Sequence, residues 1–469
     1  MGLVRAAAAG LVAVSALAAV VGVVAATTPA NVDVSQRHLN ESEETIAVNP
    51  TNPKNIVVIS NIGHREAGLT AGMFAAVSLD GGATWTRRLI GLGAGDPLGD
   101  ACCDPSLSFD RYGNLFLTYL YQTENVVPVA LSTDGGLSFN LVQNIVAPPS
   151  GTPTKAAGDS RGLFRFVDQP TITTGEGMVW VIFNAGGPMV ATGAPVSGAG
   201  QVGAFSQVEV VPGTNNCTYG DVAIGPAGQV MQVCTLTETG QGGGKLFVNV
   251  DPDGLGPAGF GDRIFVAATH VGGFDFIPPQ PDRSVDAEPG LAWDRSGGRH
   301  NGRVYLVHTL EQKNESDNTD VYVRSSDDNG ATWSPGVRVN DDQTVTSQFL
   351  PKISLDPTTG KIAIVWYDAR NDLGGGGSGD TDGIVNTDAQ FWGAFSRDGQ
   401  TFSRNVQISA GTSNAPDSGN GIDYGDYSGL AFYGGLAHPA WSDNSNSTGT
   451  NPDGALHQLD VYTAAVAAR

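Results

Sequence analysis

The sequence predicts an all-β protein, a closed β-propeller built from four-stranded blades. Two repeated features predict this fold. A unit of two apolar strand segments joined by a short turn occurs seven times, with starts about 52 to 76 residues apart, and this spacing suits one blade with its loops. A tight-turn motif recurs in step with these units. Composition agrees, because 64 Gly among 469 residues and only 15% charged residues are typical of a turn-rich protein with a large core.

The seven units each alternate apolar and polar residues between Gly, Asn and Pro, a pattern that predicts paired strands. They begin at Glu44, Asp104, Gln169, Asp221, Glu288, Leu350 and Asp426. Seven units predict seven blades. A six-bladed ring, in which the third or fourth unit is an insertion, is the alternative.

The two ends of the chain are expected to share the last blade. The final segment, DVYTAAV from Asp460, is similar to DVYVRSS from Asp320, which has the position of a third strand. The segment NVDVSQ from Asn31 is similar to GVRVND from Gly336, which has the position of a fourth strand. We therefore expect the N-terminal strand to complete the last blade and close the ring.

The turn motif has the skeleton S-x-D-x-G-x-[TS]-[WF]. Complete copies lie at Ser78–Trp85, Ser132–Phe139 and Ser326–Trp333, and a shortened copy lies at Ser396–Phe402. Asp and Ser in such a turn bond nearby backbone N–H groups, and Gly accepts a positive φ. We expect each copy between the third and fourth strands of its blade, with degenerate turns there in the third and fourth units.

This skeleton resembles the Asp box, or bacterial neuraminidase repeat, of the sialidase superfamily. The resemblance implies that residues 31–469 form a single sialidase-like propeller domain. In that superfamily the Asp box lies at outer turns, away from the catalytic centre. The motif therefore indicates an architecture and leaves the reaction open.

Residues 1–30 have the pattern of a targeting segment. Arg5 precedes an apolar run from Ala6 to Ala26, where small residues allow cleavage. We expect secretion through a signal peptide. The run is also long enough to span a bilayer, so a retained N-terminal anchor is the alternative and would be the chain's one contact with a membrane. A net charge of −22 argues against binding nucleic acid or an anionic membrane.

The cysteines are expected to form structural disulfides, because an exported protein meets oxidising conditions. Cys217 and Cys234 flank the first two strands of the fourth unit and can staple that blade. The adjacent pair Cys102 and Cys103 can form a vicinal ring, or each can reach another partner.

Acidic residues stand at the starts of the predicted inner strands, which a propeller gathers around one mouth of its central channel. They are Glu44, Asp104, Asp168, Asp221, Glu288 and Asp426. Crowded carboxylates raise one another's pKa, which suits a general acid, or they bind a cation. The alternative is that each caps the backbone or pairs with a neighbouring blade.

The sialidase resemblance also implies three arginines that grip the substrate carboxylate, a Tyr–Glu nucleophile pair and an Asp acid/base. Candidate nucleophiles are Tyr424 and Tyr427, and the candidate acid/base is Asp104. The candidate substrate-binding residues are Arg37, Arg165, Arg283 and Arg370. The Arg-Ile-Pro run of the family is absent before the first blade, where the chain reads SQRHLNESEETIAV. Surface or inter-blade salt bridges are the alternative role of these arginines.

Two functions from different classes follow, and whether the chain is an enzyme stays open. The missing arginine motif favours a secreted propeller that binds a glycan, or another extracellular ligand such as a protein, at the acidic mouth without catalysis. The alternative is an exo-glycosidase of sialidase type that hydrolyses terminal acidic sugars. Neither function requires a cofactor.

Calcium binding is a further hypothesis. The segment DLGGGGSGDTDG offers oxygen ligands from Asp372, Asp380 and Asp382. It lacks the complete twelve-residue calcium-loop pattern, and a disordered loop without metal is the alternative.

Overall fold

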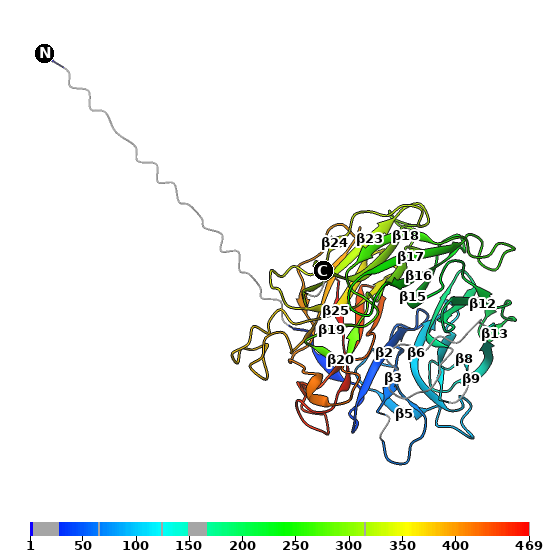
Figure 1. Cartoon of the computed structure of the whole chain (residues 1–469), viewed down its shortest axis with the longest axis horizontal. Helices are drawn as coiled ribbons and strands as arrows, with labels where there is room; N and C mark the ends of the chain where they lie inside the picture. The colour runs from blue at the N-terminus through cyan, green and yellow to red at the C-terminus, as the bar shows by residue number, and fades with distance from the viewer. Residues whose placement is uncertain (3–27, 64–65, 123–124, 149–166, 314–315, 469) are drawn as a thin grey trace.

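The computed structural model describes residues 1–2, 28–63, 66–122, 125–148, 167–313 and 316–468. From residue 28 onward they form a seven-bladed β-propeller of antiparallel sheets (Figure 1). The predicted all-β class and the seven blades are confirmed. In the described part of the chain the sole helix is the short 3-10 helix η1 (Pro416–Ser418).

Blades 1 to 4 follow one another along the chain, each starting with its innermost strand. Blade 1 contains β2 (Glu41–Val48), β3 (Ile56–Ile62), β4 (Met73–Ser78) and β5 (Thr86–Ile90). Blade 2 contains β6 (Ala101–Phe109), β7 (Leu115–Tyr121), β8 (Val126–Ser132) and β9 (Asn140–Val146). Blade 3 contains β10 (Asp168–Gly175), β11 (Met178–Asn184), β12 (Met189–Gly198) and the short edge strands β13 (Gln201–Val202) and β14 (Glu209–Val210). Blade 4 contains β15 (Cys217–Ile224), β16 (Val230–Thr237), β17 (Gly244–Asp251) and β18 (Ile264–Thr269).

Blades 5 and 6 repeat the same order, and blade 7 combines strands from both ends of the chain. Blade 5 contains β21 (Gly290–Trp293), β22 (Val304–Glu311), β23 (Thr319–Ser326) and β24 (Val337–Arg338). Blade 6 contains β25 (Gln348–Leu355), β26 (Ile362–Asp368), β27 (Gln390–Ser396) and β28 (Val406–Gln407). Blade 7 contains β29 (Gly429–Tyr433), β30 (Leu436–Asp443), β31 (Asp460–Ala464), β1 (Asn31–Asp33) and the short β32 (Val466–Ala467), which pairs with β30.

The ring closes as the sequence predicts. Strand β1 lies antiparallel to β31, with Asn31 opposite Ala464. The pairing continues past the strand, since the backbone N–H of Val34 donates to the carbonyl of Val461 at 2.7 Å. Val34 is fully buried in the apolar cluster between blades 7 and 1. The N-terminal segment is therefore held by both backbone pairing and side-chain burial.

The Asp boxes lie between the third and fourth strands of blades 1, 2, 5 and 6, as expected. In the first copy, Asp80 accepts hydrogen bonds from the backbone N–H and the hydroxyl of Thr84 at 2.9 and 2.6 Å. Ser78 accepts from the N–H of Gly82 at 2.8 Å, and Gly82 has a φ of 93°. These bonds hold the pKa of Asp80 down at about 2. Each turn is thus fixed by its own side chains.

A two-stranded hairpin between blades 4 and 5 was not anticipated. It consists of β19 (Asp275–Ile277) and β20 (Gln280–Val285). Gln280 donates from its amide to the carbonyl of Gly425 at 3.0 Å and accepts from the N–H of Tyr424 at 2.8 Å. The hairpin is therefore docked on the segment that leads into blade 7, and it carries Arg283 with it.

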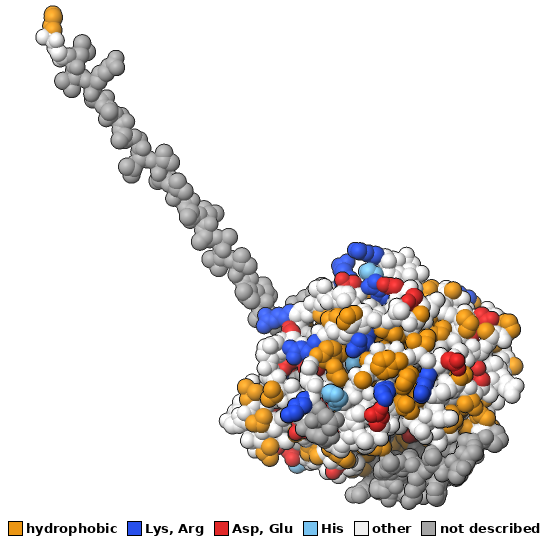
Figure 2. Space-filling view, turned by 45° about the horizontal axis from the view of Figure 1, so that its top comes forward, with side chains coloured by type: hydrophobic (Ala, Val, Ile, Leu, Met, Phe, Trp, Pro, Cys, Tyr) orange, Lys and Arg blue, Asp and Glu red, His pale blue; other side chains and the backbone are white. Residues whose placement is uncertain are grey.

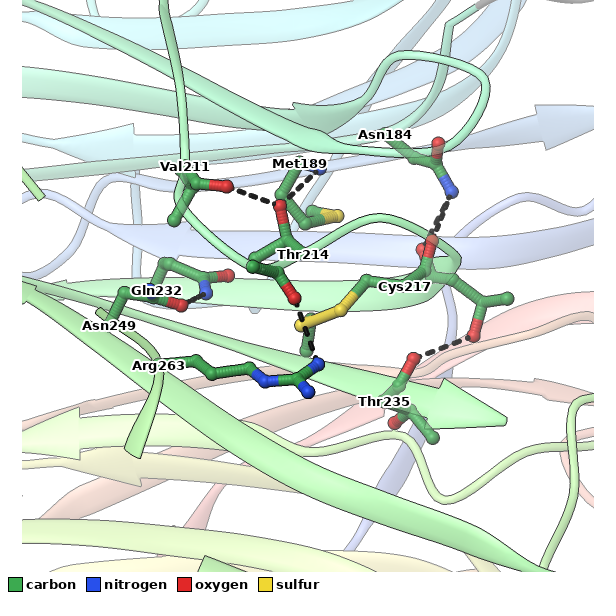
Figure 3. The surroundings of a disulfide bond; sticks show 12 residues. Asn184, Met189, Val211, Thr214, Cys217, Gln232, Thr235, Asn249 and Arg263 are labelled. Carbon is green, nitrogen blue, oxygen red and sulfur yellow. Dashed lines mark hydrogen bonds between the residues drawn. A yellow bond between two sulfur atoms is a disulfide. The ribbon is translucent and has the colours of Figure 1, made fainter. Parts of the chain in front are cut away.

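The cysteines form disulfides as expected, and Cys102 and Cys103 adopt the vicinal alternative. Cys217 and Cys234 join β15 to β16, and Figure 3 shows the pair beside Thr214. The Asn184 amide of blade 3 donates to the Cys217 carbonyl at 2.9 Å, so the staple also contacts the neighbouring blade. Cys102 and Cys103 form the vicinal ring at the start of β6.

The leader prediction falls on residues 3–27, outside the described residues. Among the residues that are described, no helix is long and apolar enough to cross a membrane.

We predict that removing the closing strand destabilises the whole ring. A chain that begins at residue 37 lacks β1 and the buried Val34, whose side-chain burial alone contributes about 1.5 to 3 kcal/mol. Its free energy of unfolding should fall by at least about 2 kcal/mol relative to a chain that begins at Ala30. Urea denaturation followed by tryptophan fluorescence measures this difference. Equal stability of the two chains would contradict the closure.

Candidate functional site

A central channel runs between the inner strands and contains two cavities. The smaller, about 210 Å³, is lined by residues from all seven blades near the starts of the inner strands, including Glu44, Asp221, Lys352 and Tyr427. The larger, about 610 Å³, lies at the opposite ends of the same strands. We place the candidate site at the strand starts, which we call the acidic mouth, because carboxyl groups that raise one another's pKa gather there.

The acidic mouth differs from the outer surface in how charge is distributed. On the face drawn in Figure 2, acidic and basic side chains are scattered among apolar and polar ones. At the mouth, by contrast, carboxyl groups from blades 1, 2 and 5 and from the segment before blade 7 influence one another's titration.

A β-bulge at the start of the inner strands sets which side chains face the mouth. The strand register shifts between Ser42 and Thr45 in blade 1 and between Cys103 and Ser106 in blade 2. The first bulged residues, Glu43 and Asp104, have positive φ values of 57° and 54°. A left-handed conformation costs a residue with a side chain about 1 to 3 kcal/mol, and such strain is typical of functional sites.

The structural equivalent of Asp104 in blade 1 is therefore Glu43, which is absent from the set predicted at the strand starts. Glu288 of blade 5 likewise has a positive φ, of 42°. The predicted residue Glu44 is also buried at the channel. Its pKa is raised to about 8 because burial penalises its charge.

Arg283 contacts the mouth from β20. Its Nε donates to Asp426 Oδ1 at 2.6 Å and its Nη2 donates to the other carboxylate oxygen, so the pair is bidentate. Its backbone N–H donates to Asp423 at 2.9 Å. The charge of Asp426 is the main cause that raises the pKa of Arg283. The guanidinium group of Arg283 therefore already binds the carboxylate of Asp426.

Glu43 connects this ion pair to blade 2. It accepts from the N–H of Asp426 at 3.1 Å and from the side-chain amide of Asn61. The Asn61 oxygen in turn accepts from the N–H of Asp104 at 3.0 Å. Burial, followed by the charges of Asp104 and Asp426, raises the pKa of Glu43 well above its usual value. Burial and the neighbouring charges therefore favour the protonated form of Glu43.

A second acidic pair precedes blade 5. The N–H of Glu288 donates to Asp286 Oδ1 at 2.6 Å. Burial raises the pKa of Asp286 to about 7, and burial with the charge of Asp286 raises the pKa of Glu288 further from its usual value. Glu288 Oε2 is buried and has no hydrogen-bond partner among the described residues. The mouth thus presents carboxyl groups that hold protons near neutral pH.

The two candidate tyrosines lie in different environments. Tyr427 lines the channel, and its pKa is raised by burial and then by Asp104 and Glu43, so the phenol is neutral. Tyr424 is fully buried, its hydroxyl donates to the carbonyl of Ser413 at 3.0 Å, and its ring stacks on Tyr367. Tyr427 therefore has access to a ligand in the channel, and Tyr424 packs in the core.

The other candidate arginines have carboxylate partners of their own. Arg37 pairs with Glu41 at 3.2 Å and with Glu66. Arg370 pairs with Asp368 at 2.8 Å and with Asp341 at 2.7 Å. The guanidinium of Arg370 also lies over the ring of Trp392, 4.2 Å from its centre.

Arg165 falls outside the described residues. Of the three candidate arginines that the structure describes, Arg283 is the one whose titration is coupled to the mouth carboxyl groups Asp426 and Glu43.

The candidate calcium segment forms a cluster that differs by one residue from the prediction. One carboxylate oxygen each from Asp372, Asp380 and Asp388 lies within 4.8 Å of the others. Asp382 is outside this group and accepts from the N–H of Ile384 at 2.7 Å. Asp388 lies beyond the Gly-rich stretch, where no spacing pattern pointed to it.

These three carboxylates are the ligand type that calcium takes. Asp372 also accepts backbone hydrogen bonds from Thr387 and Asp388 at 2.7 and 2.9 Å. The cluster is therefore held in place by the protein itself.

Comparison with known proteins identifies the fold and goes no further. No family model matches the sequence, and no curated protein matches it. Among solved structures, the polysaccharide lyase Uly1 matches with a TM-score of 0.50 and 10% identity over 91% of this chain and 90% of that chain. The GH93 α-L-arabinofuranosidase of Fusarium graminearum matches with a TM-score of 0.45 and 12% identity over 72% and 92%.

A sialidase from Trypanosoma rangeli matches with a TM-score of 0.41 and 11% identity over 91% of this chain and 55% of that chain. At these identities the likeness is one of fold. With its seven four-stranded blades and its Asp boxes, the chain has the sialidase-like β-propeller fold.

Proposed function

We propose that this chain is an exported propeller that binds a glycan at the acidic mouth, and that the sugar bound there is uncharged. The bidentate pair between Arg283 and Asp426 is the observation that carries this proposal. A guanidinium that already holds a carboxylate is not free to hold the carboxylate of an acidic sugar. An anionic ligand would also meet the surrounding carboxyl groups, and like charges brought together cost several kcal/mol.

The protonation pattern of the mouth supports recognition of sugar hydroxyls. A protonated carboxyl group donates a hydrogen bond, whereas an ionised one accepts. The pKa of Glu43 is raised well above its usual value beside the ion-paired Asp426, which favours a donor next to an acceptor. A sugar hydroxyl also donates and accepts, and the channel-lining Tyr427 adds an aromatic face and a hydroxyl.

Hydrolysis of an uncharged glycoside is the second candidate function. Its support is that the charge of Asp104 raises the pKa of Glu43. Two carboxyl groups kept in different protonation states are the requirement for acid and nucleophile or base in most glycosidases. In the sialidase-type alternative, Tyr427 attacks and Asp104 is the acid/base. That alternative needs arginines free for substrate, and it has less support.

We predict that Tyr427→Phe and Asp104→Asn weaken glycan binding. Tyr427→Phe removes a hydroxyl group and Asp104→Asn replaces a carboxyl group with an amide. The affinity for an uncharged oligosaccharide should therefore fall about tenfold or more in each variant. A glycan array identifies the ligand and calorimetry measures its affinity. Tyr433→Phe, a tyrosine at the opposite end of the channel, is the matched control. A preference for sialylated glycans would contradict the proposal.

We predict for the second candidate that fluorogenic neutral glycosides are hydrolysed and a sialoside is not. Glu43→Gln removes the proton donor and should lower kcat at least about a hundredfold. Sialoside turnover that disappears in Tyr427→Phe would instead establish the sialidase-type reaction. If no glycoside is hydrolysed while a glycan still binds, hydrolysis is rejected and the binding function remains.

The protonated mouth also predicts an inverted pH dependence of stability. The pKa values of Asp286 and Glu44, about 7 and 8, lie above their usual values of about 4. Between about pH 4 and 8 the folded state holds protons that the unfolded chain has released, so the stability that these two groups contribute is fully present below about pH 4 and is lost as pH rises to about 8. Urea denaturation at pH 5, 7 and 9 measures the slope. Glu44→Gln should flatten it, and a rise in stability toward pH 9 would contradict the assignment.

A further inference from the structure

The end of the channel opposite the acidic mouth contains the larger cavity, of about 610 Å³. This volume lies within the range of about 300 to 1,000 Å³ that is usual for small-molecule sites. Most of the residues that line it, at the far ends of the inner strands, are apolar, including Phe109, Trp293, Leu355 and Phe432, and polar atoms contribute a comparable share of the wall surface. None of the glycan-site residues Glu43, Asp104, Asp286 and Tyr427 lines it.

Arg295 extends into this cavity from the loop after β21. Its Nη2 donates to the carbonyl of Thr174 in β10 at 3.1 Å, so the side chain reaches from blade 5 to blade 3. A Cβ built on Gly175 would lie 1.5 Å from Nη1 of Arg295. The guanidinium therefore occupies the space that any side chain at residue 175 would need. Residue 175 in β10 is a glycine, and the absence of a side chain there leaves the space for the guanidinium of Arg295.

The charge of Arg295 has no ion-pair partner in the described parts of the chain. Burial lowers the pKa of its guanidinium, and Glu176 is the acid that acts against this shift. Glu176 itself is exposed. The other acid on the cavity wall, Asp110, accepts from the N–H groups of Tyr112 and Asn114 at 2.8 and 3.0 Å.

Arg111, the second arginine on the wall, is exposed and donates to the hydroxyl of Tyr112 at 2.9 Å. Arg295 is thus a partly desolvated cation facing a cavity that also presents apolar side chains. A carboxylate brought into such a place forms charge-assisted, bidentate hydrogen bonds. An apolar body attached to it is stabilised by burial against the walls.

We propose that this cavity binds a small carboxylate with an apolar body, and that its carboxylate pairs with Arg295. The site is distinct from the glycan site and does not depend on it. A neutral apolar molecule would leave the guanidinium without its partner. Inorganic phosphate would leave the apolar walls uncovered and would bring a second negative charge toward Glu176.

The experiment is calorimetric titration of the purified full chain with octanoate. Octanol, of the same length without the charge, and inorganic phosphate are the comparison probes. Octanoate should bind at least tenfold more tightly than either. Arg295→Gln should weaken octanoate binding at least tenfold. Glu176→Gln, the matched variant from the adjacent turn, should leave binding unchanged or tighten it.

Equal affinity for octanol and octanoate would overturn the proposal, because the cavity would then be apolar only. Undiminished octanoate binding in Arg295→Gln would overturn it as well, as would tighter binding of phosphate or no binding of octanoate. Circular dichroism establishes that Arg295→Gln is folded. Should that variant not fold, the comparison of the three probes on the natural chain decides the question by itself.

Discussion

The fold depends on the pairing of β1 with β31, which joins the two ends of the chain in one blade. An open propeller would expose two sheet edges and the apolar faces of its terminal blades, and closure removes both liabilities. Val34 and Val461 are fully buried in the cluster that joins blades 7 and 1. Closure also places the inner strands of all seven blades around one channel. The acidic residues at the starts of these strands meet because the strands converge there.

Convergence explains why the carboxyl groups hold protons. Inner strands that all run in the same direction bring their starts together, and the bulges with positive φ aim Glu43 and Asp104 at that place. Two arrangements reduce the repulsion between these carboxyl groups. Asp426 is neutralised by Arg283, and the pKa of Glu43 is raised well above its usual value by burial and by the charges of Asp104 and Asp426. A ligand at this mouth meets the carboxyl groups, the ion-paired Arg283 and the ammonium group of Lys352.

The sequence predicts the blades, the Asp boxes, the closure and the disulfides because each depends on local patterns whose physical meaning does not change with context. It predicts the site less well. Glu44 was the expected acid of blade 1, but a bulge displaces the register so that Glu43 is the equivalent of Asp104. The alternation of apolar and polar residues along a strand does not indicate where the register shifts. The position of Arg283 depends on a hairpin docked by Gln280, a contact across more than a hundred residues. Asp388 joins its cluster through loop folding alone.

The same directionality gives the channel two chemically different ends. The starts of the inner strands collect Glu43, Asp104 and Glu288, and the far ends lead into short turns where Arg295 lies against Gly175. The interacting carboxyl groups therefore lie at one end of the channel and Arg295 lies at the other. Apolar residues such as Leu291 and Ile353 line the channel between the two ends. The two cavities share apolar wall residues such as Leu107 and Leu430, and they differ in the charged groups at their ends.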